Sequence, residues 1–150
     1  MEKKIAHLEM IQAIITRMAN NSFALKGWAV TLVAGLFALS SKDANQFYYL
    51  VTYIPIVVFW FLDAYYLDQE RWFRKLYEKV IQIDEANIDF SMVPPYPKCD
   101  DVTNPKERKK KIAAEKREAY FKVFISTTIL GFYLPLAIMT AGIIIITAII

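Results

Sequence analysis

The final 28 residues of the chain, Val123 to Ile150, contain no charged side chain. As a single helix they would extend about 42 Å, whereas the hydrocarbon core of a bilayer is about 30 Å thick. The segment is too long for one upright span and, because it contains no polar turn, too short for two. We expect one transmembrane helix over residues 120–150, tilted or kinked at Pro135. A turn at Tyr133-Leu134-Pro135, giving four spans in total, is the alternative.

Two earlier segments are also long and apolar enough to cross a membrane. The first contains FALKGWAVTLVAGLFAL, within residues 23–40, and the second is FYYLVTYIPIVVFWFLDAYY, at residues 47–66. The polar turn SSKDANQ separates them. The hydrophobic share of the chain, 56%, is typical of a membrane protein and not of a soluble domain.

Residues 1–21 predict an amphipathic helix and not a signal peptide, because charges are spread throughout the segment. The polar run Asn20-Asn21-Ser22 then interrupts the pattern and is expected to cap the first span. The amphipathic helix would lie on the membrane or pack against a partner. Its apolar residues recur at helical spacing, at Ile5, Leu8, Ile11, Ile15 and Met18.

The distribution of Lys and Arg predicts the orientation, since cytoplasmic segments are enriched in both. The turn between the first two spans carries one, Lys42; the segment up to Lys26 carries four, and residues 64–122 carry thirteen. We therefore expect the N-terminus and the long middle segment in the cytoplasm. The C-terminus would lie outside, which for a bacterial inner membrane means the periplasm.

The middle segment, residues 67–118, contains no independent domain. Asp68 to Ala86 continues the second span as a helix, whereas Asn87 to Thr103 contains three prolines and is expected to be extended or turn-like. A helix begins again with Asn104 as its cap and Pro105 at its first position. The expected fold class is an all-α membrane protein with a single membrane domain, in which the second and third spans have helical cytoplasmic extensions.

Composition excludes most enzyme chemistries. Cys99 is the only cysteine and His7 the only histidine, so one chain can form no intrachain disulfide, no thiolate zinc site and no histidine-based triad. We expect no enzyme activity, no metal site and no cofactor. The spans also lack the carboxylate relays and broken helices of transporters, so any pore must be built from several copies.

Lys26 and Asp63 are the two charges near the membrane ends of the first hairpin. In a hairpin centred near residues 43–44, Lys26 faces Phe61, and Asp63 lies within a turn of it. An ionisable group at membrane depth costs several kcal/mol unless it is paired or hydrated. One interpretation is a structural ion pair, or a Lys26 that snorkels to the interface. The other is a charged ring at the inner mouth of an oligomeric pore.

Gly27, Thr31 and Gly35 form a stripe of small residues at four-residue spacing. Small residues let helix backbones approach closely, which drives packing in lipid. The stripe would seat another span of the same chain or form a contact between subunits, and the sequence favours neither. Pro55 and Pro135 can kink their helices, which suits a gate but is also common in helices that only pack.

A basic cluster precedes the third span, where seven Lys and Arg residues against three Glu give residues 106–118 a charge of +4. The simplest interpretation is a juxtamembrane segment that touches anionic lipid. The alternative is a polyanion site, because basic residues interleaved with aromatic ones hold phosphates and stack bases, and symmetry repeats the charge around an oligomer axis. Its candidate residues are Lys106, Arg108, Lys109, Lys110, Lys111, Lys116 and Arg117, with Arg71, Arg74 and Lys75 of the preceding helix.

Three stretches resemble small bacterial inner-membrane proteins: LKGWAVTLVAGLFALSSKDAN at residues 25–45, FWFLDAYYLDQERWFRKLYEKV at residues 59–80 and NIDFSM at residues 87–92. In size and layout the chain is similar to the membrane effectors of bacterial anti-phage systems, most of all to the Hailong-type channel effector. That family is an oligomeric membrane channel controlled by a short single-stranded DNA oligomer, which a nucleotidyltransferase partner makes. The resemblance implies a homo-oligomer, expected to be a tetramer, whose basic cytoplasmic face binds the oligonucleotide and whose gate is closed in the bound state.

The expected function is that of a homo-oligomeric channel or pore in a bacterial inner membrane, acting in anti-phage defence and gated by an oligonucleotide or nucleotide signal. Expected partners are membrane lipids, further copies of the chain, a short single-stranded nucleic acid or nucleotide second messenger, and a nucleotidyltransferase encoded nearby. Two alternatives stay open: a membrane anchor or scaffold without a pore, and a toxin that disrupts the envelope without a ligand.

Overall fold

The structure, a computed structural model, describes residues 2–40, 50–95 and 104–149. Within these ranges the chain is helical and contains no β-strand, which confirms the expected all-α class. The turn around Lys42 and the single cysteine, Cys99, lie outside the described residues. In chain order, the helices are α1 (Glu2–Ser40), α3 (Tyr53–Gln82), the short 3-10 helix η1 (Glu85–Asn87), α4 (Pro105–Phe124) and α5 (Thr127–Ile149).

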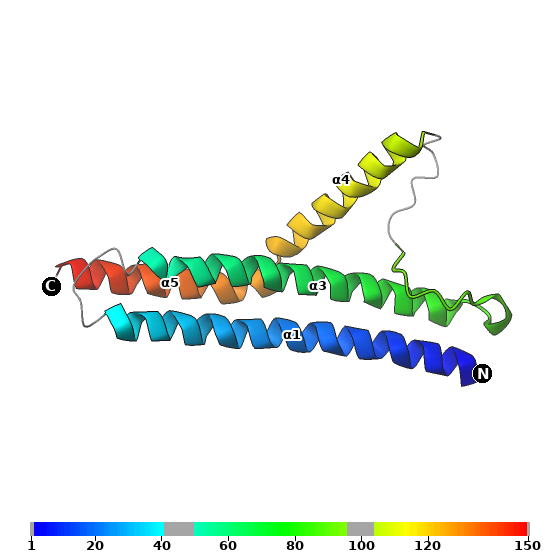
Figure 1. Cartoon of the computed structure of the whole chain (residues 1–150), viewed down its shortest axis with the longest axis horizontal. Helices are drawn as coiled ribbons and strands as arrows, with labels where there is room; N and C mark the ends of the chain where they lie inside the picture. Colours follow the sequence, from blue (N-terminus) through cyan, green and yellow to red (C-terminus); the bar gives the residue numbers. More distant parts are fainter. Residues whose placement is uncertain (1, 41–49, 96–103, 150) are drawn as a thin grey trace.

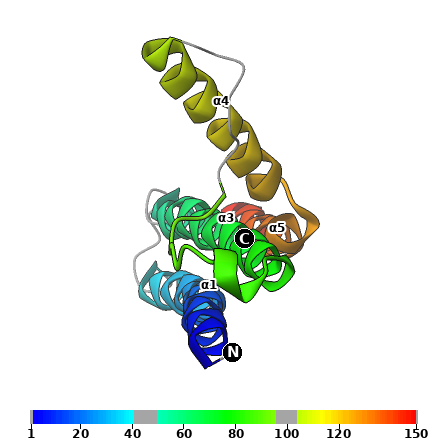
Figure 2. The ribbon, with the colours of Figure 1, turned by 90° about the vertical axis from the view of Figure 1, so that its right-hand side faces the viewer.

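The three long helices form an elongated bundle, and α4 leaves it at an angle (Figure 1). α1 and α3 run antiparallel, α5 lies along the first half of α3, and α1 and α5 therefore point the same way. The end-on view places α1 and α5 on different sides of α3, with α4 projecting outward (Figure 2). Two of the helices, α1 and α5, are long and apolar enough to cross a membrane.

One apolar core joins α1, α3 and α5 in the half of the bundle where the chain is most hydrophobic. Its buried members come from all three helices, which pack as expected for apolar stripes at helical spacing. Large side chains on the outer faces of these helices stay exposed, such as Trp28 of α1 and Met139 of α5. The buried members are Ala29, Val33, Ile56, Ile129 and Tyr133.

A second core joins the N-terminal half of α1 to the C-terminal half of α3, through Ile11, Ile15, Leu76 and Val80. The amphipathic helix predicted for residues 1–21 therefore has α3 of its own chain as its partner. It is also not a separate helix, because α1 runs without interruption from Glu2 to Ser40. The predicted break is wrong, since a helix packed on both sides of this point tolerates three polar residues.

α3 confirms that the second predicted span continues as a helix into the middle segment, although it ends at Gln82 rather than Ala86. Its C-terminal carbonyls are capped by α1, because the Lys4 ammonium donates to the carbonyls of Ile81 at 3.0 Å and Ile83 at 2.7 Å. Pro55 is the third residue of α3. Leu50 and Val51 before it are also helical and Thr52 is a turn, so the helix is interrupted where the missing Pro55 N–H would have bonded.

The third predicted span is divided into two helices. α4 ends at Phe124, Ile125 and Ser126 form a turn, and α5 then continues through Pro135. Both sequence alternatives are therefore wrong at this point: the helix does not run on from Tyr120, and no turn occurs at Pro135. The break frees the Phe124 carbonyl from the helix, and Trp60 of α3 donates its indole N–H to that carbonyl at 3.1 Å.

Helix α4 begins as predicted. The Asn104 side chain accepts a hydrogen bond from the Lys106 backbone N–H at 3.0 Å, and Pro105 occupies the first helical position. Between η1 and Pro95 the described chain is irregular and not helical, with Phe90 at a positive φ of 52° and a turn in which the Ser91 N–H donates to Asp89. This confirms the non-helical linker for the residues before Tyr96. His7, the only histidine, is buried beside the ring of Phe90 in this linker, with 5.5 Å between ring centres.

Candidate functional site: the α3–α4 junction and a buried polar cluster

The C-terminal half of α4 is attached to α3, and its N-terminal part is not. The Tyr120 hydroxyl donates to the Phe61 carbonyl at 3.0 Å, and the Phe124 ring stacks on Trp60 with 5.1 Å between ring centres. By contrast, every residue from Asn104 to Lys111 is exposed. We call residues 104–111 the basic arm; it projects from the bundle in both views of the chain (Figures 1 and 2).

Asp68 is a buried carboxylate on α3, within electrostatic range of Lys116 and Tyr120 of α4. Its side chain is only 8% exposed and accepts a hydrogen bond from the Trp72 side chain. Burial raises the pKa of Asp68, and the positive charges of Arg71, Lys75 and Lys116 oppose that rise. The junction is therefore a buried carboxylate within the field of three cations from two helices.

The ten candidate polyanion residues fall into separate groups. The positive charges of Arg71, Lys75 and Lys116 each act to lower the pKa of Asp68. Arg74 instead pairs with Glu70 one turn away on α3, at 2.7 Å, and the Lys75 ammonium lies 4.2 Å from the centre of the Trp72 ring. The others lie on exposed positions of α4, five of them in the basic arm: Lys106, Arg108, Lys109, Lys110, Lys111 and, beyond the arm, Arg117.

Asp68 should make the stability of the fold depend on pH. Because its pKa is raised above the ordinary value of 3.8, the folded protein binds a proton here more readily than the unfolded chain. As pH falls through the pKa of folded Asp68, protonation of this carboxylate should therefore increase the free energy of unfolding. The increase is complete once pH is below 3.8, the ordinary pKa of the group. The difference in unfolding temperature between wild type and Asp68→Asn, followed from about pH 7 to about pH 4, isolates the contribution of Asp68. A wild type that loses stability relative to the variant as pH falls would contradict this assignment.

A second polar site lies inside the apolar core, where Ser22, Lys26 and Asp63 meet. Asp63 is fully buried, and its Oδ2 lies 2.5 Å from the Lys26 ammonium. The Ser22 hydroxyl donates to Oδ1 of Asp63, and Lys26 donates to the Ser22 hydroxyl oxygen at 2.9 Å. The two charges that the hairpin register brings within a turn of each other thus form an ion pair between α1 and α3.

Helix α5 completes this polar cluster through Tyr133. The Tyr133 hydroxyl donates to the Phe59 carbonyl at 3.2 Å and lies close to Asp63. All three long helices therefore contribute to one buried cluster of Ser22, Lys26, Asp63 and Tyr133. A nucleophilic Ser–Lys pair needs a neutral amine, whereas Lys26 is held here by a carboxylate, so the arrangement favours structure over acyl transfer.

Sequence reasoning missed Ser22 and Tyr133 as members of this cluster. Ser22 was assigned to a helix cap, although it lies four residues before Lys26 and therefore on the same helix face. That spacing was the available signal. Tyr133 carried no comparable signal, because its proximity to Asp63 results from the packing of α5 on α3.

The small-residue stripe of α1 faces away from the other helices that the structure describes. A side-chain carbon added at Gly27 or Gly35 would meet no atom within 4 Å, and the Thr31 hydroxyl donates to its own helix, to the Gly27 carbonyl at 2.9 Å. The sequence left two predictions for the stripe, packing against another span of the same chain and contact between subunits. The first is therefore wrong for α3, α4 and α5. The stripe is open to lipid or to another molecule.

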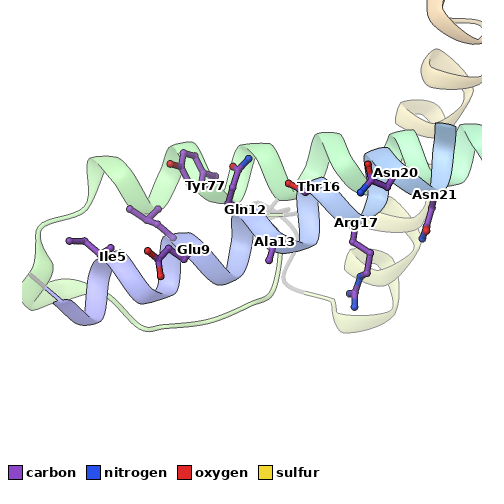
Figure 3. Close-up of a pocket in the computed structure, with 10 residues that line it drawn as sticks. Ile5, Glu9, Gln12, Ala13, Thr16, Arg17, Asn20, Asn21 and Tyr77 are labelled. Carbon is purple, nitrogen blue, oxygen red and sulfur yellow. The ribbon is translucent and has the colours of Figure 1, made fainter. Parts of the chain in front are cut away.

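A groove continues the same face of α1 toward its N-terminus (Figure 3). The small residues Ala13, Thr16 and Asn20 line it and share a helix face with Gly27 and Thr31, because they recur every three or four positions. Tyr77 of α3 forms part of its wall. Arg17 is the one basic residue in the lining, so the groove does not suit a polyanion.

Comparisons of the chain with protein-family models, curated proteins and solved structures found no match. The described residues offer three features: a basic arm with a charged junction at its base, a buried polar cluster among the long helices, and an outward face of small residues on α1.

Proposed function

We propose that the chain is a homo-oligomeric membrane channel or pore effector, gated by an oligonucleotide or nucleotide signal and acting in bacterial anti-phage defence. The observation that carries this proposal is the course of α4. Its basic arm is exposed, its C-terminal half is fastened to α3, and two residues after its end the chain enters α5. A ligand held by the arm would act directly on an apolar helix long enough to cross a membrane.

In this proposal α3 provides the third span, between α1 and α5. Its first half shares the apolar core with both helices, while its second half carries the charged residues that α4 contacts. The arm, the junction and the second core then lie on the cytoplasmic side, in agreement with the Lys and Arg distribution. The C-terminus lies in the periplasm.

Self-association is supported by the outward face of α1. In lipid, helices associate where small side chains let their backbones approach, and Gly27, Thr31 and Gly35 are open on that face. The groove around Ala13 and Thr16 lies beyond the apolar core shared by α1, α3 and α5, and in this proposal it is outside the hydrocarbon core of the membrane. Another copy of the chain can cover both parts at once, and a ring of copies would surround an axis with basic arms.

The gating mechanism follows from the connection between α4 and α5. An anion that bridges neighbouring arms would fix the spacing of the α4 helices. Because α4 is fastened to α3 at Tyr120 and joined to α5 by Ile125 and Ser126, that spacing is transmitted to two spans. The Hailong-type resemblance favours a gate that closes when the ligand is bound.

The proposal is tested with purified protein in detergent. We expect a defined oligomer by light scattering, and binding of a labelled single-stranded DNA oligomer that weakens steeply between about 50 mM and about 200 mM salt. Gly35→Leu places a bulky side chain on the open face and should lower the oligomer mass, whereas Val30→Leu, at an exposed position outside the four-residue series of the stripe, should not. A monomer that ignores the oligonucleotide at both salt concentrations would leave a membrane anchor as the function.

A further inference from the structure

Exposed aromatic side chains gather at one level along the bundle. Six aromatic residues are exposed among the described residues, and one of them, Phe90, lies apart from the others in the linker after η1. The other five come from α1, α3 and α4, and each of them is more than half exposed. We call these five residues the aromatic belt: Phe23, Trp28, Phe61, Tyr65 and Phe121.

Contacts between α1 and α3 bring their belt residues to the same level. The Ser22 hydroxyl belongs to the residue before Phe23, and it donates to Asp63 of α3. Asp63 in turn lies between Phe61 and Tyr65 along α3. The second belt residue of α1 follows the first after about 8 Å of helix. The aromatic side chains of these two helices are therefore close to one plane across the bundle.

Helix α4 reaches the same level where it is fastened to α3. The hydroxyl of Tyr120, next to Phe121, donates to the Phe61 carbonyl at 3.0 Å, and the rings of Phe61 and Phe124 are 4.8 Å apart between centres. Figure 1 shows α4 leaving the bundle near the middle of its length. The aromatic belt therefore separates the half of the bundle with the three-helix apolar core from the half with the second core.

The apolar side of the aromatic belt has the length of a bilayer. α5 contains 23 residues, about 34 Å of helix, and residues 23–40 of α1 extend about 27 Å, whereas the hydrocarbon core is about 30 Å thick. Trp and Tyr are enriched at membrane surfaces, and Phe inserts its ring at the same boundary. We propose that the aromatic belt contacts the headgroup layer of the cytoplasmic leaflet, and that Arg71 and Arg117 bind anionic lipid there. The bilayer itself rests on the proposed function.

The two arginines are exposed and lie just outside the aromatic belt, on its cytoplasmic side. Arg71 follows Tyr65 after about 9 Å of α3, and Arg117 precedes Phe121 by about 6 Å of α4. The headgroup layer on each side of the hydrocarbon core is about 5–8 Å thick, so the long Arg side chains reach it. A guanidinium group binds a phosphate oxygen pair through parallel hydrogen bonds, which suits the phosphate of an anionic lipid.

A pocket on α4 joins one of these arginines to the aromatic belt. Its volume is about 350 Å³, and its lining residues are Ala114, Arg117, Glu118 and Phe121. The acidic member, Glu118, is paired with the Lys122 ammonium at 2.8 Å, which offsets its charge. An aromatic wall beside a guanidinium group fits the boundary between a lipid headgroup and its acyl chains. Both arginines are then assigned to lipid, and the exposed basic arm stays free for a soluble polyanion.

The first test measures how phosphatidylglycerol, added to the detergent, raises the unfolding temperature of each full-length variant above its own lipid-free value. Combining Arg71→Gln with Arg117→Gln should raise the apparent Kd for this lipid roughly ten- to thirtyfold. Combining Lys109→Gln with Lys110→Gln removes the same charge from the basic arm and should stay within about twofold of wild type. Equal affinities of the two double variants for phosphatidylglycerol would overturn the inference.

The second test locates the membrane surface with spin labels on α3 in liposomes. Val58 and Glu78 are exposed and lie on opposite sides of the aromatic belt. In a Cys99→Ser background, the label at Val58→Cys should collide mainly with oxygen, which concentrates in the hydrocarbon core. The label at Glu78→Cys should collide mainly with a water-soluble nickel complex.

The outcomes separate this inference from the proposed function. A Glu78→Cys label shielded from the nickel complex would place the membrane surface beyond the aromatic belt, which overturns the belt but leaves the channel proposal standing. If both labels are open to the nickel complex, α3 does not cross the membrane and both proposals fail. If the labels and the lipid behave as expected and single-stranded DNA does not bind, the belt holds and the oligonucleotide signal fails.

Discussion

Asp63→Asn is expected to remove about 3–5 kcal/mol from the stability of the folded protein. The substitution keeps the shape of the side chain but leaves the Lys26 ammonium, 19% exposed, without its charge partner inside the core. It also weakens the bond that Ser22 donates. The measurement is the temperature at which the protein loses its size-exclusion peak in detergent, together with the yield of assembled protein.

A double-mutant cycle separates the ion pair from its surroundings. Lys26→Gln added to Asp63→Asn should cost little more than Asp63→Asn alone, because the partner of Lys26 is already gone. The exposed pair between Glu118 and Lys122, at 2.8 Å, is the control: Glu118→Gln should leave the temperature at which the size-exclusion peak is lost unchanged, because solvent screens this pair. Normal assembly of both core variants with altered conductance would instead identify Lys26 and Asp63 as a charged ring at a pore mouth.

Neutralising the basic arm is expected to weaken oligonucleotide binding by roughly tenfold or more at low salt. The variant replaces Lys109, Lys110 and Lys111 with Gln; all three are exposed on the projecting arm. If each contacts one phosphate, the slope of log affinity against log salt should become shallower by about 2 for a single strand. Fluorescence anisotropy at several salt concentrations measures both quantities.

The control for this prediction removes the same charge elsewhere. Lys3, Lys79 and Lys122 are also exposed, but they lie outside the arm. Their replacement by Gln should change the slope of log affinity against log salt by no more than about 0.5. If the control and arm variants lose affinity equally, binding follows net charge and the arm is not a receptor. If the arm variant loses affinity for anionic vesicles but not for DNA, the arm binds lipid.

Local signals in the sequence predicted the helices correctly wherever the relevant contacts are short-range. Asn104 and Pro105 mark the start of α4, because a cap and a fixed backbone angle act within one turn. The register of a tight hairpin likewise places Lys26 near Asp63, and in the structure the Lys26 Nζ lies 2.5 Å from the Asp63 Oδ2. The helix break predicted at Ser22 is wrong because the cap was inferred from local sequence alone. The Ser22 hydroxyl instead donates a hydrogen bond to Asp63 of α3.

The sequence alone determined the apolar helices, the basic character of α4 and the absence of histidine and cysteine clusters, because these depend on residue type and spacing along one element. Only the tertiary structure decided that α4 and α5 part at Ile125 and Ser126, that the stripe on α1 faces outward, and that Ser22 of α1 and Tyr133 of α5 meet Asp63 of α3. The physical reason is that these features depend on which helix face is buried against which neighbour. Helical periodicity defines the faces, but the packing free energy of the whole bundle chooses among them.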